Sequence, residues 1–143
     1  MSELFANIGV NKKDGTLVNG GEALAGKTVA LYFSAHWCPP CRQFTPVLKD
    51  FYEELEDEDF EIVFVSFDRS ESDLKAYLAE CHGDWLHVPF GSEHIQELAA
   101  KFGVNGIPAL IVIKSNGDVI TSNGRADVQN KPPKQALAAW KSA

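Results

Sequence analysis

The chain has 143 residues, a length that favours one domain with one hydrophobic core, and we expect a single domain over residues 1–143. Apolar residues make up 45% of the chain, charged residues 23%, and the formal net charge is −7. A surface that binds nucleic acid or anionic lipid needs positive charge, and no stretch approaches the roughly 18 apolar residues of a membrane span. We therefore expect neither nucleic acid nor a membrane as a partner.

The first half of the chain has the pattern of a strand–helix–strand unit preceded by a hairpin. Residues 7–21 are polar and glycine-rich, and Asp14-Gly15 predicts a tight turn between two short strands. Residues 28–33 and 61–67 are apolar runs typical of strands covered on both faces. Between them, apolar residues recur at helical intervals until an acidic run at residues 53–59 marks the helix end. The residues of this apolar face are Phe44, Val47, Leu48, Phe51, Tyr52 and Leu55.

The second half continues with alternating helices and strands. Ser72 and Asp73 are candidate caps for a helix, and Ser92 for another. Strands are expected at residues 109–113 and 119–121, and Asn116-Gly117 between them predicts a type I′ hairpin turn. Pro132-Pro133 predicts the start of a last helix. The inward residues of these helices are Leu74, Tyr77, Leu78 and Cys81, then Ile95, Leu98, Ala99 and Phe102, and finally Leu137 and Trp140. The expected fold is α/β, a central mixed β-sheet flanked by helices with an N-terminal β-hairpin extension.

Two thiols lie three positions apart at the predicted start of the first long helix, in the sequence Trp-Cys-Pro-Pro-Cys at residues 37–41. A residue before proline avoids helical geometry, so Cys38 is expected at the helix cap. Pro40 has no backbone N–H, and the free donors of the first turn are expected to come from Cys41 and Arg42. With the helix dipole, these donors favour a Cys38 thiolate, and a pKa decrease from about 8.5 to about 7 corresponds to about 2 kcal/mol.

This arrangement predicts a cycle of two attacks on disulfide bonds. Cys38 is expected to be the exposed nucleophile, and Cys41, one turn into the helix, is expected to be shielded and to attack second. Pro39 and Pro40 stiffen the loop and are expected to tune the reduction potential. Because Pro40 also disfavours helical geometry at Pro39, a helix that starts one residue later is an alternative.

Several longer motifs give the chain a family resemblance. The string Ser-Ala-His-Trp-Cys-Pro-Pro-Cys-Arg occupies residues 34–42, with Phe-Thr-Pro at 44–46, Val-Ser-Phe-Asp-Arg at 65–69, Trp-Leu-His-Val-Pro-Phe at 85–90 and Gly-Ile-Pro at 106–108. Together they resemble the thioredoxin superfamily, and within it the tryparedoxin and nucleoredoxin group, over residues 25–121. The resemblance implies a thioredoxin-like sandwich.

The resemblance also implies roles for individual residues. Cys38 would be the nucleophile and Cys41 the resolving thiol. The Ile107–Pro108 bond would be cis and would face the cysteines. Trp37 would shape the surface beside Cys38.

Three further positions follow from the same resemblance. Asp68 and Arg125 fall where the tryparedoxin-like family places charged groups near the site. Tyr32 occupies the position at which ordinary thioredoxins carry a buried acid that moves the proton of the second thiol. The proton route must therefore differ here, through the Tyr32 hydroxyl, water or Asp68.

A zinc site is the main chemical alternative. Cys38 and Cys41 could form half of it, with Cys81 and either His82 or His36 completing it. Two prolines inside the pair are unusual for a zinc knuckle and no second Cys-X-X-Cys exists, so no metal is expected. Cys81 is expected to be a buried structural thiol. His36 is near enough to influence Cys38, whereas His82, His87 and His94 are expected at the surface or at edges.

The sequence therefore predicts a thiol-disulfide oxidoreductase that reduces protein or peptide disulfides. No glycine-rich phosphate loop precedes a helix, so no cofactor is expected, and electrons must come from an external dithiol or reductase. Disulfide-bearing proteins are the expected substrates, peroxiredoxin-like ones among them, and a monomer is expected. The alternative is a redox-sensing, nucleoredoxin-like binding protein that regulates a signalling partner.

Cysteine usage and the N-terminal residues indicate the compartment. Residues 1–5 lack a basic segment followed by an apolar block, so no signal peptide is predicted. Three cysteines leave one unpaired by count, which is unlike a structural disulfide framework. We expect a reducing compartment and hence a cytoplasmic location, with the nucleus as a second location.

Overall fold

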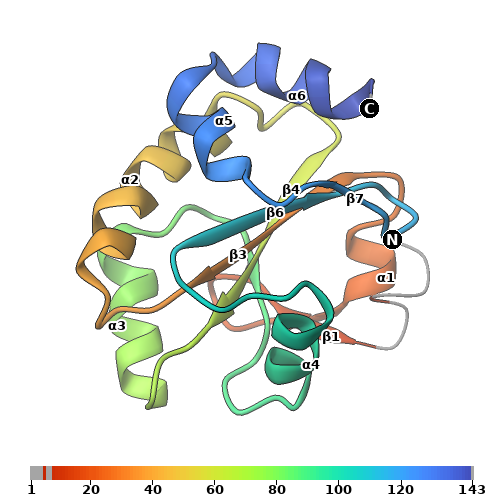
Figure 1. Ribbon diagram of the computed structural model, residues 1–143. Helices are drawn as coiled ribbons and strands as arrows, with labels where there is room; N and C mark the ends of the chain where they lie inside the picture. The colour runs from red at the N-terminus through yellow and green to blue at the C-terminus, as the bar shows by residue number, and fades with distance from the viewer. Residues whose placement is uncertain (1–4, 6–7, 143) are drawn as a thin grey trace.

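The computed structural model describes Phe5 and residues 8–142, so the predictions that concern residues 1–4 and Asn7 lie outside the described residues. The described strands form one mixed sheet in the order β2-β1-β5-β4-β3-β6-β7 (Figure 1). Their bounds are β1 Gly9–Asn11, β2 Leu17–Asn19, β3 Thr28–Ser34, β4 Phe60–Ser66, β5 Leu86–His87, β6 Ala109–Ile113 and β7 Val119–Thr121. This confirms the predicted α/β class and the N-terminal hairpin, which extends the sheet beyond β5.

The central strands form because their residues are apolar on both faces. All seven residues of β3 are buried, and β3 pairs in parallel with β4 from Thr28 opposite Phe60 to Ser34 opposite Ser66. On its other side β3 pairs with β6 in the antiparallel direction. The continuous apolar runs therefore predicted the strands covered on both faces correctly.

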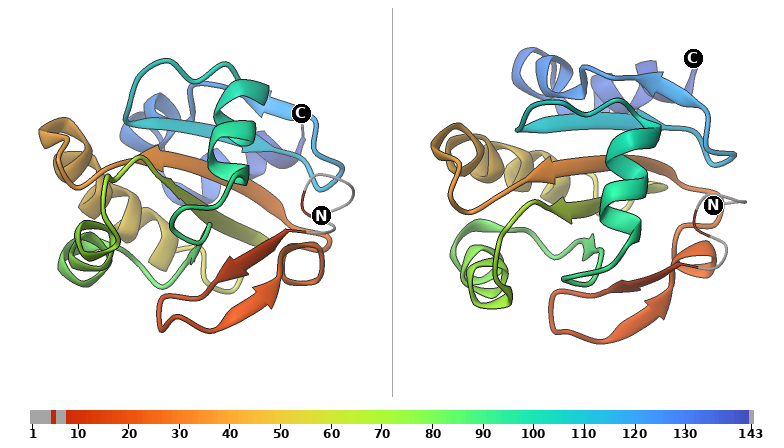
Figure 2. Two further views of the ribbon diagram at one scale, coloured as in Figure 1. Left: turned by 90° about the horizontal axis from the view of Figure 1, so that it is seen from below. Right: turned by 60° about the horizontal axis from the view of Figure 1, so that its bottom comes forward.

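Helices cover the two faces of this sheet. The helices α2 (Pro39–Glu53), α3 (Glu71–Cys81), α5 (Gly124–Asn130) and α6 (Pro133–Lys141) pack on one face, and α1 (Gly20–Ala23) and α4 (His94–Lys101) on the other. Figure 2 shows α4 on the opposite side of the sheet from α2 and α6. Alternate residues of β3 point into the two layers, with Tyr32 in the α2 layer and Phe33 in the α4 layer.

The start of α2 agrees with the main sequence prediction, whereas the caps of two helices differ from it, and one of these is α4, which has Glu93 and not Ser92 at its N-cap. Helix α2 begins at Pro39 with Cys38 as its N-cap, so the alternative start one residue later is wrong. Helix α3 is capped by Ser70, which accepts the backbone N–H of Asp73 at 3.2 Å, and not by Ser72 or Asp73. Both serines fit a capping pattern, and the tertiary position of the chain decides between them.

Other differences concern faces and turns. Val47 is exposed, because the buried face of α2 runs through Phe44, Leu48 and Phe51 instead. The β6–β7 turn is not type I′, since Gly117 alone has positive φ in it and Asn116 does not. The Gly117 N–H donates to the Lys114 carbonyl, as in a type I turn followed by a left-handed glycine. Elements α1, β5 and α5 were not predicted.

Candidate active site

Cys38 and Cys41 are joined by a disulfide at the start of α2, with their Cα atoms 5.2 Å apart. Cys38 has extended backbone geometry, as expected for a residue before proline, and its Sγ accepts the Cys41 backbone N–H at 3.3 Å. The Arg42 N–H donates to the Cys38 carbonyl at 3.1 Å and is therefore not free for the sulfur, contrary to the sequence prediction. The positive end of the helix dipole and a single N–H thus face Cys38 Sγ.

The two sulfurs differ in exposure, but less than predicted. Cys38 is 5% exposed and Cys41 is fully buried. Both pack against Ala35, Phe67 and Ile107 in a small apolar cluster. Cys38 is thus the more accessible of the two in the disulfide form, but the expectation of a freely exposed Cys38 is wrong for this state because Phe67 and Ile107 cover it.

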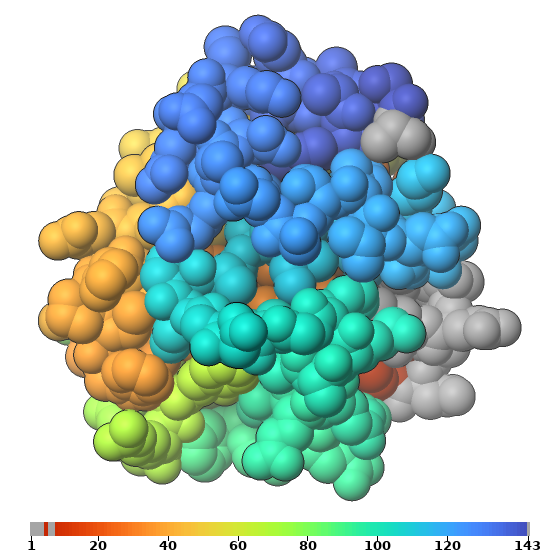
Figure 3. Space-filling model, viewed as in Figure 1, coloured from red at the N-terminus to blue at the C-terminus, as the bar shows by residue number. Residues whose placement is uncertain are grey.

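The loop before β6 lies directly against Cys38. Its Ile107–Pro108 peptide bond is cis, and the Ile107 carbonyl oxygen lies 4.0 Å from Cys38 Sγ. Arg125, at the start of α5, donates from Nη1 to the Pro108 carbonyl at 3.3 Å and stacks over the Phe44 ring. Figure 3 shows the start of α2 in orange in contact with this loop in teal. Arg125 therefore lies at the site and bridges the loop before β6 and helix α2.

Trp37 presents a fixed aromatic surface next to Cys38. Its side chain is 49% exposed, and its Nε1–H donates to the Phe67 carbonyl at 3.1 Å. The guanidinium carbon of Arg69 lies 5.3 Å from the centre of the indole ring, within the range of a cation–π contact. Sequence analysis did not single out Arg69, because it is an exposed loop residue whose partner is 32 positions earlier in the chain.

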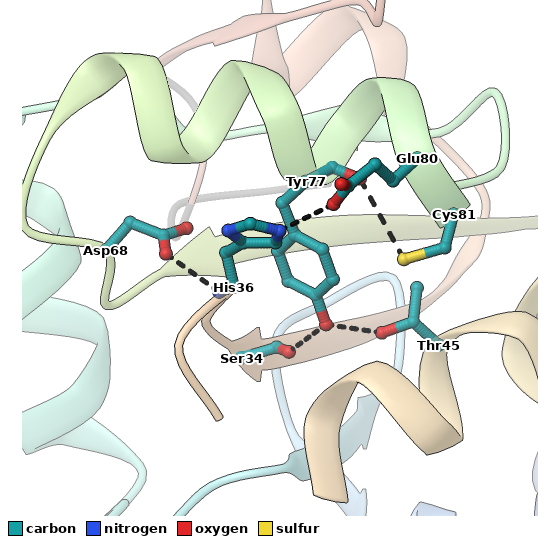
Figure 4. Close-up of polar contacts among 7 residues, drawn as sticks. All are labelled: Ser34, His36, Thr45, Asp68, Tyr77, Glu80 and Cys81. Carbon is teal, nitrogen blue, oxygen red and sulfur yellow. Dashed lines mark hydrogen bonds and ion pairs between the residues drawn. The ribbon is translucent and has the colours of Figure 1, made fainter. Parts of the chain in front are cut away.

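Asp68 fixes the loop that precedes Trp37. Its Oδ1 accepts the His36 backbone N–H at 2.7 Å and its Oδ2 accepts the Ser66 hydroxyl at 2.6 Å. The His36 ring pairs with Glu80 of α3, and Figure 4 shows His36 between Asp68 and Glu80. Neither carboxylate oxygen of Asp68 has a hydrogen bond to a cysteine within the described residues, so the geometry gives Asp68 a positioning contact.

A chain of buried hydroxyl groups links Cys41 to α3. The Thr45 hydroxyl donates to the Cys41 carbonyl at 2.8 Å and also contacts the Tyr32 hydroxyl at 2.6 Å and the Tyr77 hydroxyl at 2.5 Å. The Tyr77 hydroxyl in turn lies 2.6 Å from the Ser34 hydroxyl (Figure 4). Burial raises the pKa of Tyr32 and of Tyr77, so both hydroxyls stay protonated at neutral pH.

The hydroxyl of Tyr32 therefore reaches the peptide carbonyl of Cys41, at 3.4 Å, and no hydrogen bond joins it to a cysteine sulfur among the described atoms. The Tyr32 hydroxyl was expected to lie near Cys41, which it does, but it contacts the carbonyl and not the sulfur. Thr45, Tyr77 and Ser34 were not predicted as site residues. A polar side chain in a fully buried strand, at Ser34, and one on the apolar face of a helix, at Thr45, were the available signals.

The histidine predictions were partly wrong. His82 and His87 are buried, not surface residues. Burial lowers the pKa of His82 to about 3, and the pKa of His87 is lowered for the same reason. The His82 Nδ1 accepts the Trp85 Nε1–H at 3.1 Å, and its ring packs against Phe64 and Tyr77.

Cys81 lies apart from the disulfide on α3. It is partly buried, its Sγ lies 3.9 Å from the Tyr77 carbonyl oxygen, and its pKa is raised by burial and by the Glu80 carboxylate. Across Phe5 and residues 8–142, no group of three or more His, Cys, Asp or Glu side chains could hold a metal ion. Nor does any helix in that part of the chain combine the length and apolar character needed to cross a membrane.

Comparison with known proteins identifies the family. A family model described as thioredoxin-like matches residues 26–119, well over half of the chain. This chain belongs to the thioredoxin-like family. Its fold is thioredoxin-like, and the Cys38–Cys41 pair fits the redox-active Cys-X-X-Cys motif of these oxidoreductases, which act on disulfide substrates and use dithiol or reductase partners.

Individual relatives place this thioredoxin-like protein in the tryparedoxin and nucleoredoxin group, as the sequence resemblance indicated. It is 46% identical over 113 residues to a tryparedoxin from Trypanosoma brucei brucei, with 77% of each chain covered. It is 47% identical over 111 residues to nucleoredoxin from Mus musculus, covering 76% of this chain but 25% of that protein. The chain therefore spans about a quarter of the length of the nucleoredoxins that it matches.

Solved structures agree with this placement. A thioredoxin from Wuchereria bancrofti shares 63% identity over 99% of both chains, with a TM-score of 0.87. A tryparedoxin II, solved in complex with glutathionylspermidine, shares 38% identity over 92% of both chains, with a TM-score of 0.82.

Proposed function

We propose that this protein reduces disulfide bonds in proteins or peptides through the Cys38–Cys41 pair, as a single domain over residues 1–143. The observation that carries the proposal is the pair itself. The two cysteines bond within the first turn of α2, and the Cys41 N–H donates to Cys38 Sγ. The same N–H would stabilise the Cys38 thiolate once the pair is reduced, so both redox states fit one backbone geometry.

The proposed cycle begins with the dithiol form. The Cys38 thiolate attacks one sulfur of the substrate disulfide, the substrate S–S bond breaks, and the departing sulfur leaves as a thiolate that takes up a proton. Cys41 then loses its proton and attacks Cys38 Sγ, which breaks the mixed disulfide and releases the second substrate thiol. Two electrons pass to the substrate, and the Cys38–Cys41 disulfide remains.

The surrounding residues receive supporting roles in this proposal. Trp37 and Ile107 border Cys38 and would contact the substrate. Pro39 and Pro40, in the first turn of α2, would restrict the backbone between the two sulfurs. Arg125 would support the cis Ile107–Pro108 segment through the Pro108 carbonyl.

An insulin-reduction assay with dithiothreitol as the electron source tests the proposal. We expect the wild-type protein to turn over insulin and Cys38→Ser to show no rate above the uncatalysed one. Cys81→Ser is the matched control at the partly buried third cysteine, and it should keep the wild-type turnover. A wild-type protein that gives no turnover would sink the reductase proposal.

Trapping tests the order of attack. Because Cys41 resolves the mixed disulfide in the proposed cycle, Cys41→Ser should keep substrates covalently attached to Cys38, and mass spectrometry of the adducts would identify the attached proteins. Equal trapping by Cys38→Ser would mean that the roles of the two cysteines are reversed.

The external partners are also part of the proposal. An external dithiol or reductase would return the disulfide to the dithiol, and the glutathionylspermidine complex of tryparedoxin II supports a small thiol as one electron source. Substrates would be disulfide-bearing proteins, peroxiredoxin-like ones among them. We propose a monomer in the cytoplasm, with the nucleus as a second location.

The 47% sequence identity with nucleoredoxin supports a second candidate function. In it, the redox state of the Cys38–Cys41 pair would control binding to a signalling partner. Stable capture of a partner by one redox form, without catalytic turnover of insulin, would favour this binding function over the reductase.

A further inference from the structure

Arginine occurs only three times in this chain, and all three arginines lie at the disulfide. Arg42 follows Cys41 and is exposed on the first turns of α2. Arg125 donates to the Pro108 carbonyl in the loop that covers Cys38, and the guanidinium carbon of Arg69 lies over the Trp37 ring. The chain as a whole carries a net charge of −7, so these arginines bring positive charge to the disulfide of an otherwise acidic protein.

The charge of Arg69 is available to a partner. It is exposed in the loop between β4 and α3, and none of the ion pairs among the described residues involves it. A guanidinium has five N–H donors, so one that lies over an aromatic ring still has donors that can form two parallel hydrogen bonds to a carboxylate. Its position over the indole therefore prepares Arg69 to bind a carboxylate.

Trp37 holds this cation in place beside the reactive sulfur. The indole is anchored by its hydrogen bond to the Phe67 carbonyl, yet about half of its surface remains open. Trp37 is the residue directly before Cys38, so a segment that brings its disulfide to Cys38 would pass over Trp37. The cation–π contact at 5.3 Å limits the positions that the Arg69 side chain can adopt.

Three acidic side chains nearby make other contacts. Both oxygens of Asp68 are occupied, one by the His36 N–H and the other by the Ser66 hydroxyl. Glu80 pairs with the His36 ring, and Glu71 with Lys75. These carboxylates weaken the local positive field but do not form an ion pair with Arg69.

We infer that Trp37 and Arg69 form a docking surface for carboxylate side chains that flank a partner's disulfide, so that this protein selects acidic disulfide segments of proteins. The inference rests on the proposed reductase function and adds a substrate preference to it. Glutathione disulfide also carries carboxylates, so it shares this chemistry in a small molecule. Binding of acidic protein segments and binding of glutathione disulfide must therefore be measured separately.

The test uses three synthetic disulfide peptides that differ only in the residues flanking the cysteines, which are Asp, Asn or Lys. For the wild-type protein we expect kcat/KM to be about tenfold higher with Asp than with Lys at low salt, which corresponds to one favourable charge pair. The preference should shrink as the ionic strength rises, because salt screens exposed charges. Arg69→Glu should reverse the order, and Arg69→Lys should keep its direction.

A matched control separates a local effect from overall charge. Lys141→Glu makes the same change in net charge at an exposed residue on the far end of α6, and it should leave the peptide preference and the basal turnover unchanged. If Lys141→Glu alters the Asp-to-Lys ratio as much as Arg69→Glu does, or if the wild-type protein shows no preference, the docking surface does not exist.

A binding measurement keeps this result distinct from the fate of the reductase proposal. In a Cys38→Ser/Cys41→Ser background no exchange takes place at the site, so titration calorimetry reports the noncovalent affinity for each peptide and for glutathione disulfide. Tighter binding of the Asp peptide that is lost on adding Arg69→Glu supports the inference even if turnover fails. Equal affinities for the three peptides overturn it even if turnover succeeds, and a charge-dependent affinity for glutathione disulfide alone overturns the protein-segment claim.

Discussion

The Thr45 hydroxyl donates a 2.8 Å hydrogen bond to the carbonyl oxygen of Cys41 and so ties the second cysteine of the pair to buried groups on three elements. Because this hydroxyl has one proton and donates it to the carbonyl, the hydroxyls of Tyr32 and Tyr77 must both donate to Thr45 Oγ1. Ser34 then donates to Tyr77. In this arrangement each hydroxyl has one short donor bond, the 3.4 Å contact of Tyr32 with the Cys41 carbonyl is secondary, and the network connects β3, α2 and α3.

Removing the Thr45 hydroxyl should therefore destabilise the protein. Thr45→Val keeps the shape of the side chain but removes three buried hydrogen bonds, and it leaves the Tyr32 hydroxyl with only the long 3.4 Å contact to the Cys41 carbonyl as its acceptor. We expect the free energy of unfolding to fall by about 1–3 kcal/mol, the range for an unsatisfied buried polar group, as measured by urea denaturation.

Thr28→Val is the matched control for this change. Thr28 is also a nearly buried threonine, and its hydroxyl makes no hydrogen bond within the described part of the chain. The same substitution there should change stability by less than about 0.5 kcal/mol. Equal losses at the two positions would mean that the hydroxyl network contributes nothing beyond the packing of the methyl groups.

Tyr32→Phe should leave the pH profile of disulfide reduction unchanged. The hydroxyl contacts the Cys41 carbonyl and not a sulfur, and burial raises its pKa, so it neither accepts nor releases a proton near neutral pH. The loss of one hydrogen bond should cost about 1 kcal/mol of stability. A displaced pH optimum in the phenylalanine variant would instead give Tyr32 a part in moving the Cys41 proton.

Asp68 should act by positioning the loop before Cys38. Asp68→Ala removes the acceptors of the His36 N–H and the Ser66 hydroxyl, and we expect a loss of about 1–2 kcal/mol in stability together with a lower kcat/KM. Asp68→Asn keeps one oxygen as the acceptor of the His36 N–H, so its losses of stability and of kcat/KM should be smaller. A pH profile that changes in Asp68→Asn while its stability does not would indicate a proton-transfer role.

Alkylation of the reduced protein should single out Cys38. The Cys41 N–H and the dipole of α2 favour its thiolate, whereas burial and Glu80 raise the pKa of Cys81. At pH 7 we expect iodoacetamide to modify Cys38 roughly tenfold faster than Cys81, as read by mass spectrometry of a time course. Equal rates at the two thiols would remove the basis for Cys38 as the nucleophile.

The parts of the fold that sequence predicted are those specified by local patterns. The apolar runs of β3 and β4 are buried in the observed parallel pair, and the proline-marked start of α6 is correct. Helix α5 was missed because Gly124–Asn130 carries one large buried apolar residue, Val128, and so has no helical stripe to recognise. Strand β5 has two residues, too few to show alternation.

In the site, too, local patterns predict some features and not others. The position of Cys38 at the helix cap follows from Pro39 and the spacing of the cysteines, and it could be predicted. The contact of Arg69 with Trp37 and the meeting of Ser34, Thr45 and Tyr77 join residues far apart in sequence. Ser34 in a buried strand and Thr45 on the apolar face of a helix are local signals, but no local pattern shows which side chains they meet, so only the packed structure reveals these contacts.

The burial of His82 gives the protein a defined dependence of stability on pH. In the folded state its pKa is lowered to about 3 from the ordinary value of 6.5, because the ring is enclosed by Phe64, Tyr77 and Trp85. Its Nδ1 accepts the Trp85 Nε1–H, so a proton on Nδ1 would face the Trp85 N–H and break this hydrogen bond. The folded protein therefore keeps His82 neutral at pH values at which the unfolded chain protonates it.

The contribution of His82 to stability is thus complete above pH 6.5 and is lost progressively as the pH falls from 6.5 towards 3. Between pH 7.5 and pH 5 the loss should be about 2 kcal/mol. His82→Gln removes this titration, so its unfolding free energy should decrease by about 2 kcal/mol less than that of the wild type over the same interval, as measured by urea denaturation at each pH. The lowered pKa of His87 acts in the same direction and remains in both proteins.

His94→Gln, at a partly exposed histidine paired with Glu97, is the control, and its loss of stability between pH 7.5 and pH 5 should equal that of the wild type. A His82→Gln variant with the full wild-type loss at pH 5 would show that the histidine is not held neutral in the folded state.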